Sequence, residues 1–104
     1  MMKQLLTAIA LTATAALPAM AQDARALAQS KNCMACHAVD KKLVGPSYKD
    51  VAAKYAGQNG AVDKLADKVV KGGGGVWGPV PMPANPQVSA AEAKTLTTWI
   101  LSLK

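Results

Sequence analysis

The sequence has few of the side chains that usually fill a protein core. It contains no Phe, and its only aromatic residues are Tyr48, Tyr55, Trp77 and Trp99. Aromatic side chains supply much of the apolar area that cores bury, and a chain of 104 residues has little surface to bury in any case. This length excludes a multidomain enzyme. We therefore expect one small domain whose centre is filled by something other than side chains.

The sequence also lacks a hydrophobic run long enough to cross a bilayer. The longest apolar stretch, residues 5–16, has 12 residues, whereas a spanning helix needs roughly 20. Lys3 precedes this stretch, Pro18 interrupts it, and residues 19–21 form a small-x-small cleavage site. A membrane anchor is the alternative interpretation. We expect residues 1–21 to be a secretory signal peptide, residues 22–104 to be the mature domain, and the periplasm to be its location.

Acidic residues are half as frequent as basic ones. The chain has 6 Asp and Glu against 12 Lys and Arg, with a formal net charge of +6. The lysines are scattered, and no Lys/Arg run of the kind that binds nucleic acid occurs. The excess positive charge favours encounter with an acidic protein partner, although a solvated lysine surface with no specific role would look the same.

No segment shows the alternation of apolar and polar residues that is typical of a strand. Four segments instead have the composition and spacing of short helices: residues 23–32, 47–56, 61–71 and 90–103. Asp23 is placed to cap the first, and Ser89 with Glu92 forms a capping box at the last. The last segment also carries an apolar stripe made of Leu96, Trp99, Ile100 and Leu103. The predicted fold class is all-α.

The third and fourth predicted helices are separated by an unusual loop. Residues 72–75 are four consecutive glycines, and residues 76–86 contain four prolines. A glycine run is usually a flexible linker, but the prolines that follow restrict the backbone. Long loops in small domains are often functional, so we expect this one to contribute to a site.

The strongest motif uses all the cysteine and histidine in the chain. Cys33-Met34-Ala35-Cys36-His37 has the Cys-x-x-Cys-His pattern of covalent haem c attachment. Residues three apart on a helix share a face, so both sulfurs can reach the two vinyl-derived carbons of one porphyrin. His37 then presents its imidazole to the iron. We expect one covalently bound haem c.

Three other sites use Cys-x-x-Cys and fit less well. A thioredoxin-like dithiol lies at a strand–helix junction, and no strand is predicted here. A structural zinc ion needs four ligands, whereas the two cysteines and His37 supply three. A disulfide would leave the adjacent His37 unexplained.

The sixth position of the iron has one thioether candidate. Only Met34 and Met82 follow residue 21, and Met34 lies between the two cysteines, too close to reach the opposite face. Pro81 and Pro83 flank Met82, and a stiff loop loses less entropy when it presents a weak ligand. The alternative is that Met82 fills the core.

Coordination by His37 and Met82 indicates the class of activity. It raises the reduction potential and closes the iron to substrates. An electron carrier is therefore favoured over an enzyme. The competing hypothesis is a haem enzyme or gas sensor in which Met82 can be displaced.

Three segments are similar to those of a known family: residues 33–37, residues 44–51 (VGPSYKDV) and residues 75–85 (GVWGPVPMPAN). The chain resembles the small bacterial class I c-type cytochromes of the cytochrome c-551 type over essentially all of residues 22–104. The resemblance implies a small cytochrome c fold of about four short helices around one haem, with Cys33 and Cys36 as thioethers.

The resemblance also implies roles around the two axial ligands, His37 and Met82. The Pro46 carbonyl would accept a hydrogen bond from His37, the Trp77 indole would reach a haem propionate, and Asn85 would donate to the Met82 sulfur. Without the resemblance, Pro46 could simply start a helix, Trp77 could fill the core, and Asn85 could form part of a turn.

The sequence departs from the family pattern in three places. Ala28 stands where relatives commonly carry Phe, so the contact between the first and last helices is expected to pack differently, with Tyr55 compensating. Lys68 stands where Arg often contacts the propionates, and lysine cannot reproduce a bidentate grip. One residue is inserted around Pro86 and Gln87.

The resemblance implies a periplasmic electron carrier, and a monomer is the default expectation. It would pass electrons from a quinol-oxidising complex to a terminal reductase or oxidase, such as nitrite reductase or a haem–copper oxidase, in short-lived complexes. Four lysines near the thioether edge are candidates for steering these partners: Lys31, Lys41, Lys42 and Lys49.

Overall fold

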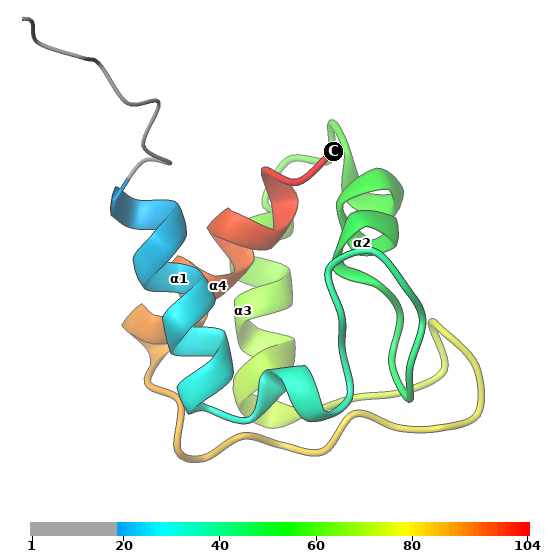
Figure 1. The fold of residues 1–104 in the computed structure, drawn as a ribbon. Helices are drawn as coiled ribbons and strands as arrows, with labels where there is room; N and C mark the ends of the chain where they lie inside the picture. The colour runs from blue at the N-terminus through cyan, green and yellow to red at the C-terminus, as the bar shows by residue number, and fades with distance from the viewer. Residues whose placement is uncertain (1–18) are drawn as a thin grey trace, which may run out of the picture.

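The computed structural model describes residues 19–104, and their side chains from Asp23 onward. Four α-helices and one short 3-10 turn make up the fold (Figure 1): α1 (Ala19–Ser30), η1 (Cys33–Ala35), α2 (Tyr48–Tyr55), α3 (Ala61–Lys71) and α4 (Ala90–Leu101). Within this part of the chain the only β-type pairing is an isolated bridge between Gly73 and Met82. The predicted all-α fold class is confirmed. The predicted signal peptide lies largely outside the described residues.

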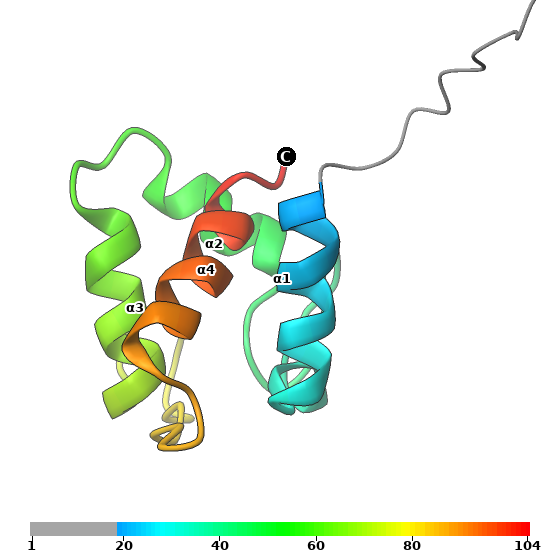
Figure 2. The ribbon, with the colours of Figure 1, turned by 90° about the vertical axis from the view of Figure 1, so that its left-hand side faces the viewer.

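Helix α4 is the centre of the fold. It packs against α1, α2 and α3, and both ribbon views show it between α1 and α3 (Figures 1 and 2). Its apolar stripe points inward, because Leu96, Trp99 and Ile100 are all buried. Leu103 lies beyond the helix end but still packs against the core. The stripe predicted for the last helix is confirmed.

Three of the four aromatic side chains lie in this core. Tyr48, Tyr55 and Trp99 are buried, and the rings of Tyr48 and Trp99 meet edge to face at 5.6 Å between centroids. Trp77, in contrast, is 41% exposed. The few aromatic residues are thus concentrated on the side of the fold where α2 meets α4.

Helix α1 makes its core contact with small residues. Ala24 and Ala28 are almost completely buried, and α1 packs directly on α4. Side chains as small as alanine allow two helices to approach closely. Tyr55, from α2, is buried in the same cluster. Ala28 and Tyr55 thus both belong to the core, and the expectation that Tyr55 compensates for Ala28 stays a prediction.

The helix ends were predicted well, with one error. Ser47 caps α2 by accepting a hydrogen bond from the backbone of Asp50, and the Ser89–Glu92 capping box at α4 is present in full. The prediction that Asp23 caps the first helix is wrong, since α1 begins at Ala19. The residues just before Asp23 are good helix formers, so the helix continues through them.

The helices are joined by shorter connections and by two long loops, residues 36–47 and 72–89. Figure 1 shows the second of them, in yellow and orange, running beneath α3 toward the start of α4. Among residues 19–104 no helix has both the length and the apolar character needed to cross a membrane.

Candidate functional site

The two cysteines lie on a tight turn directly after α1. Asn32 adopts a left-handed conformation with φ 64°, which ends α1 and starts η1. The Cys33 carbonyl then accepts from the backbone N–H groups of Cys36 and His37, at 3.3 and 3.1 Å. The prediction placed this motif on an α-helix. A 3-10 turn instead eclipses residues three apart, which also brings Cys33 and Cys36 to one side.

The His37 ring is held by two neighbours, one from the following loop and one from the start of α2. Its Nδ1 lies 2.8 Å from the carbonyl oxygen of Pro46, the contact that the family resemblance implied. The Tyr48 ring stacks on the imidazole with 5.0 Å between centroids. With Nδ1 as the donor to Pro46, the neutral ring keeps its lone pair on Nε2, the nitrogen that can then bind a metal.

Sequence reasoning missed the part played by Tyr48. It lies one residue after the N-cap of α2, and no sequence signal links it to His37. Burial raises the pKa of the Cys33 thiol, and a hydrogen bond with Tyr48 opposes part of this rise. Burial also raises the pKa of Tyr48, with Cys33 as the next cause. Both side chains are therefore neutral at neutral pH.

Met82 is held by a two-way backbone bridge to the start of its own loop. The Gly73 N–H donates to the Met82 carbonyl at 3.0 Å, and the Met82 N–H donates to the Gly73 carbonyl at 2.7 Å. Gly72, one residue earlier, ends α3 with φ 77°. The glycine run is therefore a fitted segment of the site, as expected for a functional loop, and not a free linker.

Cys33, Cys36, His37 and Met82 line one cleft. The space between its walls is about 1250 Å³, including the part that opens to solvent. Leu65, Val69, Leu96 and Ile100 form much of its apolar floor, while the segments around Val44 and Val80 form its mouth. An apolar cleft with a few convergent polar groups is typical of a cofactor site. The structure brings the four predicted ligand and attachment residues together.

Pro46, Trp77 and Lys68 also line this cleft. Trp77 lies at the surface, and the Lys54 ammonium stands 5.5 Å from its ring centroid. The Lys68 side chain lies against Gly73, because a Cβ built on Gly73 would lie 3.3 Å from Lys68 Cε. All three are where a bound planar group could contact them.

Asn85 differs from its expected role. Its amide nitrogen donates to the Val69 carbonyl at 2.9 Å and to the Pro83 carbonyl at 3.2 Å, which uses both N–H bonds and leaves none for the Met82 sulfur. Its backbone N–H also points to the carbonyls of Val69 and Val70. In this structure Asn85 anchors the Met82 loop to the end of α3.

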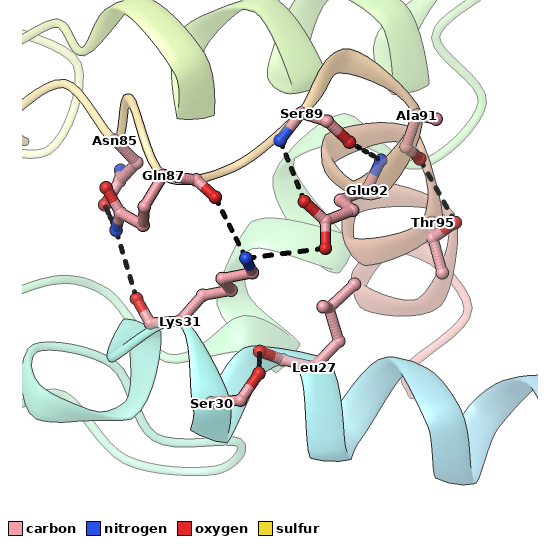
Figure 3. A network of polar contacts seen from close by, with 9 residues as sticks. All are labelled: Leu27, Ser30, Lys31, Asn85, Gln87, Ser89, Ala91, Glu92 and Thr95. Atoms are coloured by element: carbon pink, nitrogen blue, oxygen red, sulfur yellow. Dashed lines mark hydrogen bonds and ion pairs between the residues drawn. The ribbon is translucent and has the colours of Figure 1, made fainter.

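A second polar network ties the same loop to α1 (Figure 3). The Lys31 ammonium donates to the Gln87 carbonyl at 2.9 Å and lies 3.6 Å from the Glu92 carboxylate. The Gln87 amide donates back to the Lys31 carbonyl at 3.3 Å and to Asn85 Oδ1 at 3.2 Å. Lys31 is therefore engaged inside the molecule, which makes it a poor candidate for steering partners.

The other interpretations of the cysteines gain no support from the geometry. Within residues 19–104, no three His, Cys, Asp or Glu side chains are grouped so that they could hold a metal ion. Cys33 and Cys36 are free and half-buried. A covalently attached haem requires two thiols, an oriented imidazole and a thioether around an apolar cleft. The structure provides this set of groups.

Comparison with known proteins agrees with this geometry. The family model for Cytochrome c matches residues 21–104. The chain is 55% identical over 105 residues to cytochrome c-551 of Stutzerimonas stutzeri, covering 100% of both proteins. It is 53% identical over 100 residues to cytochrome c-551 of Pseudomonas aeruginosa, covering 96% of this chain and 95% of that protein.

The fold has the same relatives. The crystal structure of wild-type Nitrosomonas europaea cytochrome c552 superposes with a TM-score of 0.76 at 54% sequence identity, covering 77% of this chain and 99% of that one. Cytochrome c-552 of Hydrogenobacter thermophilus is 62% identical over 78 residues, which are 75% of this chain and 79% of that protein.

Proposed function

Because this chain belongs to the cytochrome c family and binds one haem c covalently, we propose that it is a periplasmic electron carrier with His37 and Met82 as axial ligands. The observation that supports this most directly is the single cleft shared by the two cysteines, the oriented histidine and the methionine. When bound, the haem supplies an iron that gains or loses one electron. The chain's residues determine how that iron is held.

Cys33 and Cys36 fix the cofactor. The two sulfurs would hold the haem through thioether bonds to its two vinyl-derived carbons. The η1 turn keeps the two sulfurs on one side. Covalent attachment lets a domain with so small a side-chain core retain its cofactor.

His37 supplies the first axial nitrogen. The Pro46 carbonyl fixes the tautomer through Nδ1, and the Tyr48 ring restricts rotation of the imidazole by stacking on it. Both contacts come from the 36–47 loop and the start of α2. They hold the ligand in the same position in both oxidation states, which keeps reorganisation on electron transfer small.

Met82 supplies the second axial ligand. The bridge to Gly73 and the anchor at Asn85 restrict the loop on both sides of Met82. A thioether binds weakly, so a restricted loop keeps it on the iron at a smaller cost in entropy. With the sixth position closed, the protein transfers electrons without binding a substrate at iron, which is not the behaviour of an enzyme.

A face around the mouth of the cleft fits short-lived partners. Five apolar side chains are exposed: Leu43, Val44, Val76, Trp77 and Val80. Three exposed lysines lie on or beside the 36–47 loop: Lys41, Lys42 and Lys49. An apolar centre with a charged rim is typical of protein interfaces, and lysines speed encounter with acidic partners. A quinol-oxidising complex as donor and a nitrite reductase or haem–copper oxidase as acceptor suit this carrier.

Export accounts for the N-terminal segment. Cleavage after Ala21 would remove the first residues of α1 and leave Asp23 within its new first turn, where an acidic side chain is favourable. Mass measurement of the purified protein tests both points, because haem addition and signal removal change the mass independently.

An absorption spectrum tests the axial ligation. The oxidised protein should show the far-red band of a sulfur–iron bond, and the reduced protein should not bind carbon monoxide quickly. Met82→Ala should lose the band, bind carbon monoxide and have a lower reduction potential, whereas Met34→Ala should keep the band. A protein without the band that binds cyanide or carbon monoxide rapidly would instead be the open-site enzyme or sensor.

A further inference from the structure

The polar network in Figure 3 connects the two segments that carry the axial ligands. Lys31 is two residues before Cys33, and so precedes the turn that carries His37. Gln87 is five residues after Met82 and follows the anchor at Asn85. The two residues are 56 positions apart in sequence but exchange two hydrogen bonds, one in each direction.

The hydrogen bonds between Lys31 and Gln87 connect to those that anchor the Met82 loop. The Gln87 amide also donates to Asn85 Oδ1 at 3.2 Å, and the Asn85 amide donates to the Val69 carbonyl at the end of α3. A chain of hydrogen bonds therefore runs from the end of α1, through the loop, to the end of α3. Glu92 fixes the other side of Lys31 from the first turn of α4.

We propose that Gln87 is a positioning residue that holds Met82 on the iron by tying its loop to Lys31. The proposal rests on the axial ligation proposed above. Gln87 reaches no part of the cleft itself, so it acts only through the loop. Gly73 holds the backbone of Met82 itself, and the Lys31–Gln87 pair restrains the loop on the C-terminal side of Met82.

The physical reason lies in the weakness of the thioether bond. Displacement of Met82 by another ligand requires the 82–88 segment to move away from the cleft. Each neutral hydrogen bond that resists this motion adds a modest net contribution. The Gln87 side-chain amide donates two such bonds, and Gln87→Ala removes both but keeps the Gln87 backbone carbonyl that accepts from Lys31. Loss of these bonds should raise the fraction of molecules with an open sixth position without unfolding the domain.

The test compares Gln87→Ala with Gln58→Ala in the haem-loaded protein. Gln58 is a matched control, because it is also exposed and its amide makes a single local bond to the Lys54 carbonyl. Cyanide binding to the oxidised protein reports how often the sixth position opens. We expect Gln87→Ala to bind cyanide about three- to tenfold faster, and Gln58→Ala to bind it at the unmodified rate.

Two further measurements separate positioning from general stability. Hydrogen exchange at the Met82 and Asn85 backbone amides should become faster in Gln87→Ala, while amides in α4 are unchanged. Lys31→Met, which removes the bond to the Gln87 carbonyl but keeps the Lys31 carbonyl as an acceptor, should give a smaller increase in cyanide rate.

The outcomes are distinct. If Gln87→Ala lowers the melting temperature but leaves the cyanide rate, the far-red band and Met82 exchange unchanged, the network is only structural and the inference is wrong. If the unmodified protein lacks the far-red band, the axial ligation itself is wrong. If the unmodified protein shows the band and only Gln87→Ala binds cyanide faster, the result supports both the axial ligation and the positioning role of Gln87.

Discussion

The imidazole of His37 lies directly against the backbone of Gly45. A Cβ placed on Gly45 would stand 2.5 Å from His37 Cε1 and 2.8 Å from Nδ1, distances that real Cβ contacts do not reach. The glycine is therefore required by the histidine ring, which has no room to retreat because the Tyr48 ring stacks on it.

Gly45→Ala should displace the His37 ring or the loop that carries Pro46. We expect it to reduce the free energy of unfolding by about 1–3 kcal/mol, the usual cost of overpacking, and to change the reduction potential. Denaturant unfolding and potentiometry of the haem-loaded protein measure the two effects. A variant with unchanged stability and potential would show that the loop adjusts freely around the ring.

Gly72→Ala and Gly60→Ala compare two positions of positive φ, one against the backbone of Met82 and one in open space. Gly60 (φ 75°, ψ 9°) is left-handed, where alanine costs about 1–2 kcal/mol, whereas Gly72 (φ 77°, ψ 179°) lies in a backbone region that is essentially restricted to glycine. At Gly60 a Cβ meets nothing within 4 Å, whereas at Gly72 it would lie 2.7 Å from the Met82 carbonyl oxygen. We expect Gly72→Ala to be clearly the more destabilising and to weaken the far-red band. Equal losses in the free energy of unfolding would show that the Met82 loop moves aside without destabilising the fold.

Glu92 should make stability depend on pH in the acid range. The hydrogen bond from the Ser89 backbone, and then Lys31, lower the pKa of Glu92 below 4.5. A carboxylate with a lower pKa in the folded state stabilises the fold above its unfolded pKa and loses this effect as pH falls through the folded value. The advantage of the unmodified protein over Glu92→Gln in melting temperature should therefore shrink below pH 4.5. A constant difference across pH would contradict the assignment.

Lys42 should affect partner encounter more than Lys31, Lys41 or Lys49. It lines the mouth of the cleft, whereas Lys31 is engaged with Gln87 and Glu92. Lys42→Glu should slow electron transfer to an acidic partner by up to about tenfold at low ionic strength and reduce its salt dependence. Lys94→Glu is the control, because Lys94 lies on α4 outside the cleft and pairs with Asp63. Equal effects in both variants would indicate a response to net charge alone.

The haem attachment and the fold class could be predicted from local patterns in the sequence. The Cys33–His37 motif determines its chemistry within five residues, and helix periodicity with the Ser89–Glu92 box determines α4 to within two residues of its observed end. Each of these signals depends on neighbours within one or two turns of the chain. For the same reason the start of α1 was misplaced, since Asp23 is a good cap but residues 19–22 are equally good helix formers.

The contacts around His37 and Met82 depend on residues distant in sequence. Tertiary packing decided that Tyr48 stacks on His37, that Asn85 anchors to Val69 instead of the Met82 sulfur, and that Lys31 pairs with Gln87. No spacing rule connects positions 31 and 87, because their meeting requires α1, the 72–89 loop and α4 to pack first. Short-range sequence patterns predict which cofactor is bound and which residues would hold it. The tertiary structure decided how firmly each is held, because the restraints on His37 and Met82 come from segments that only folding brings together.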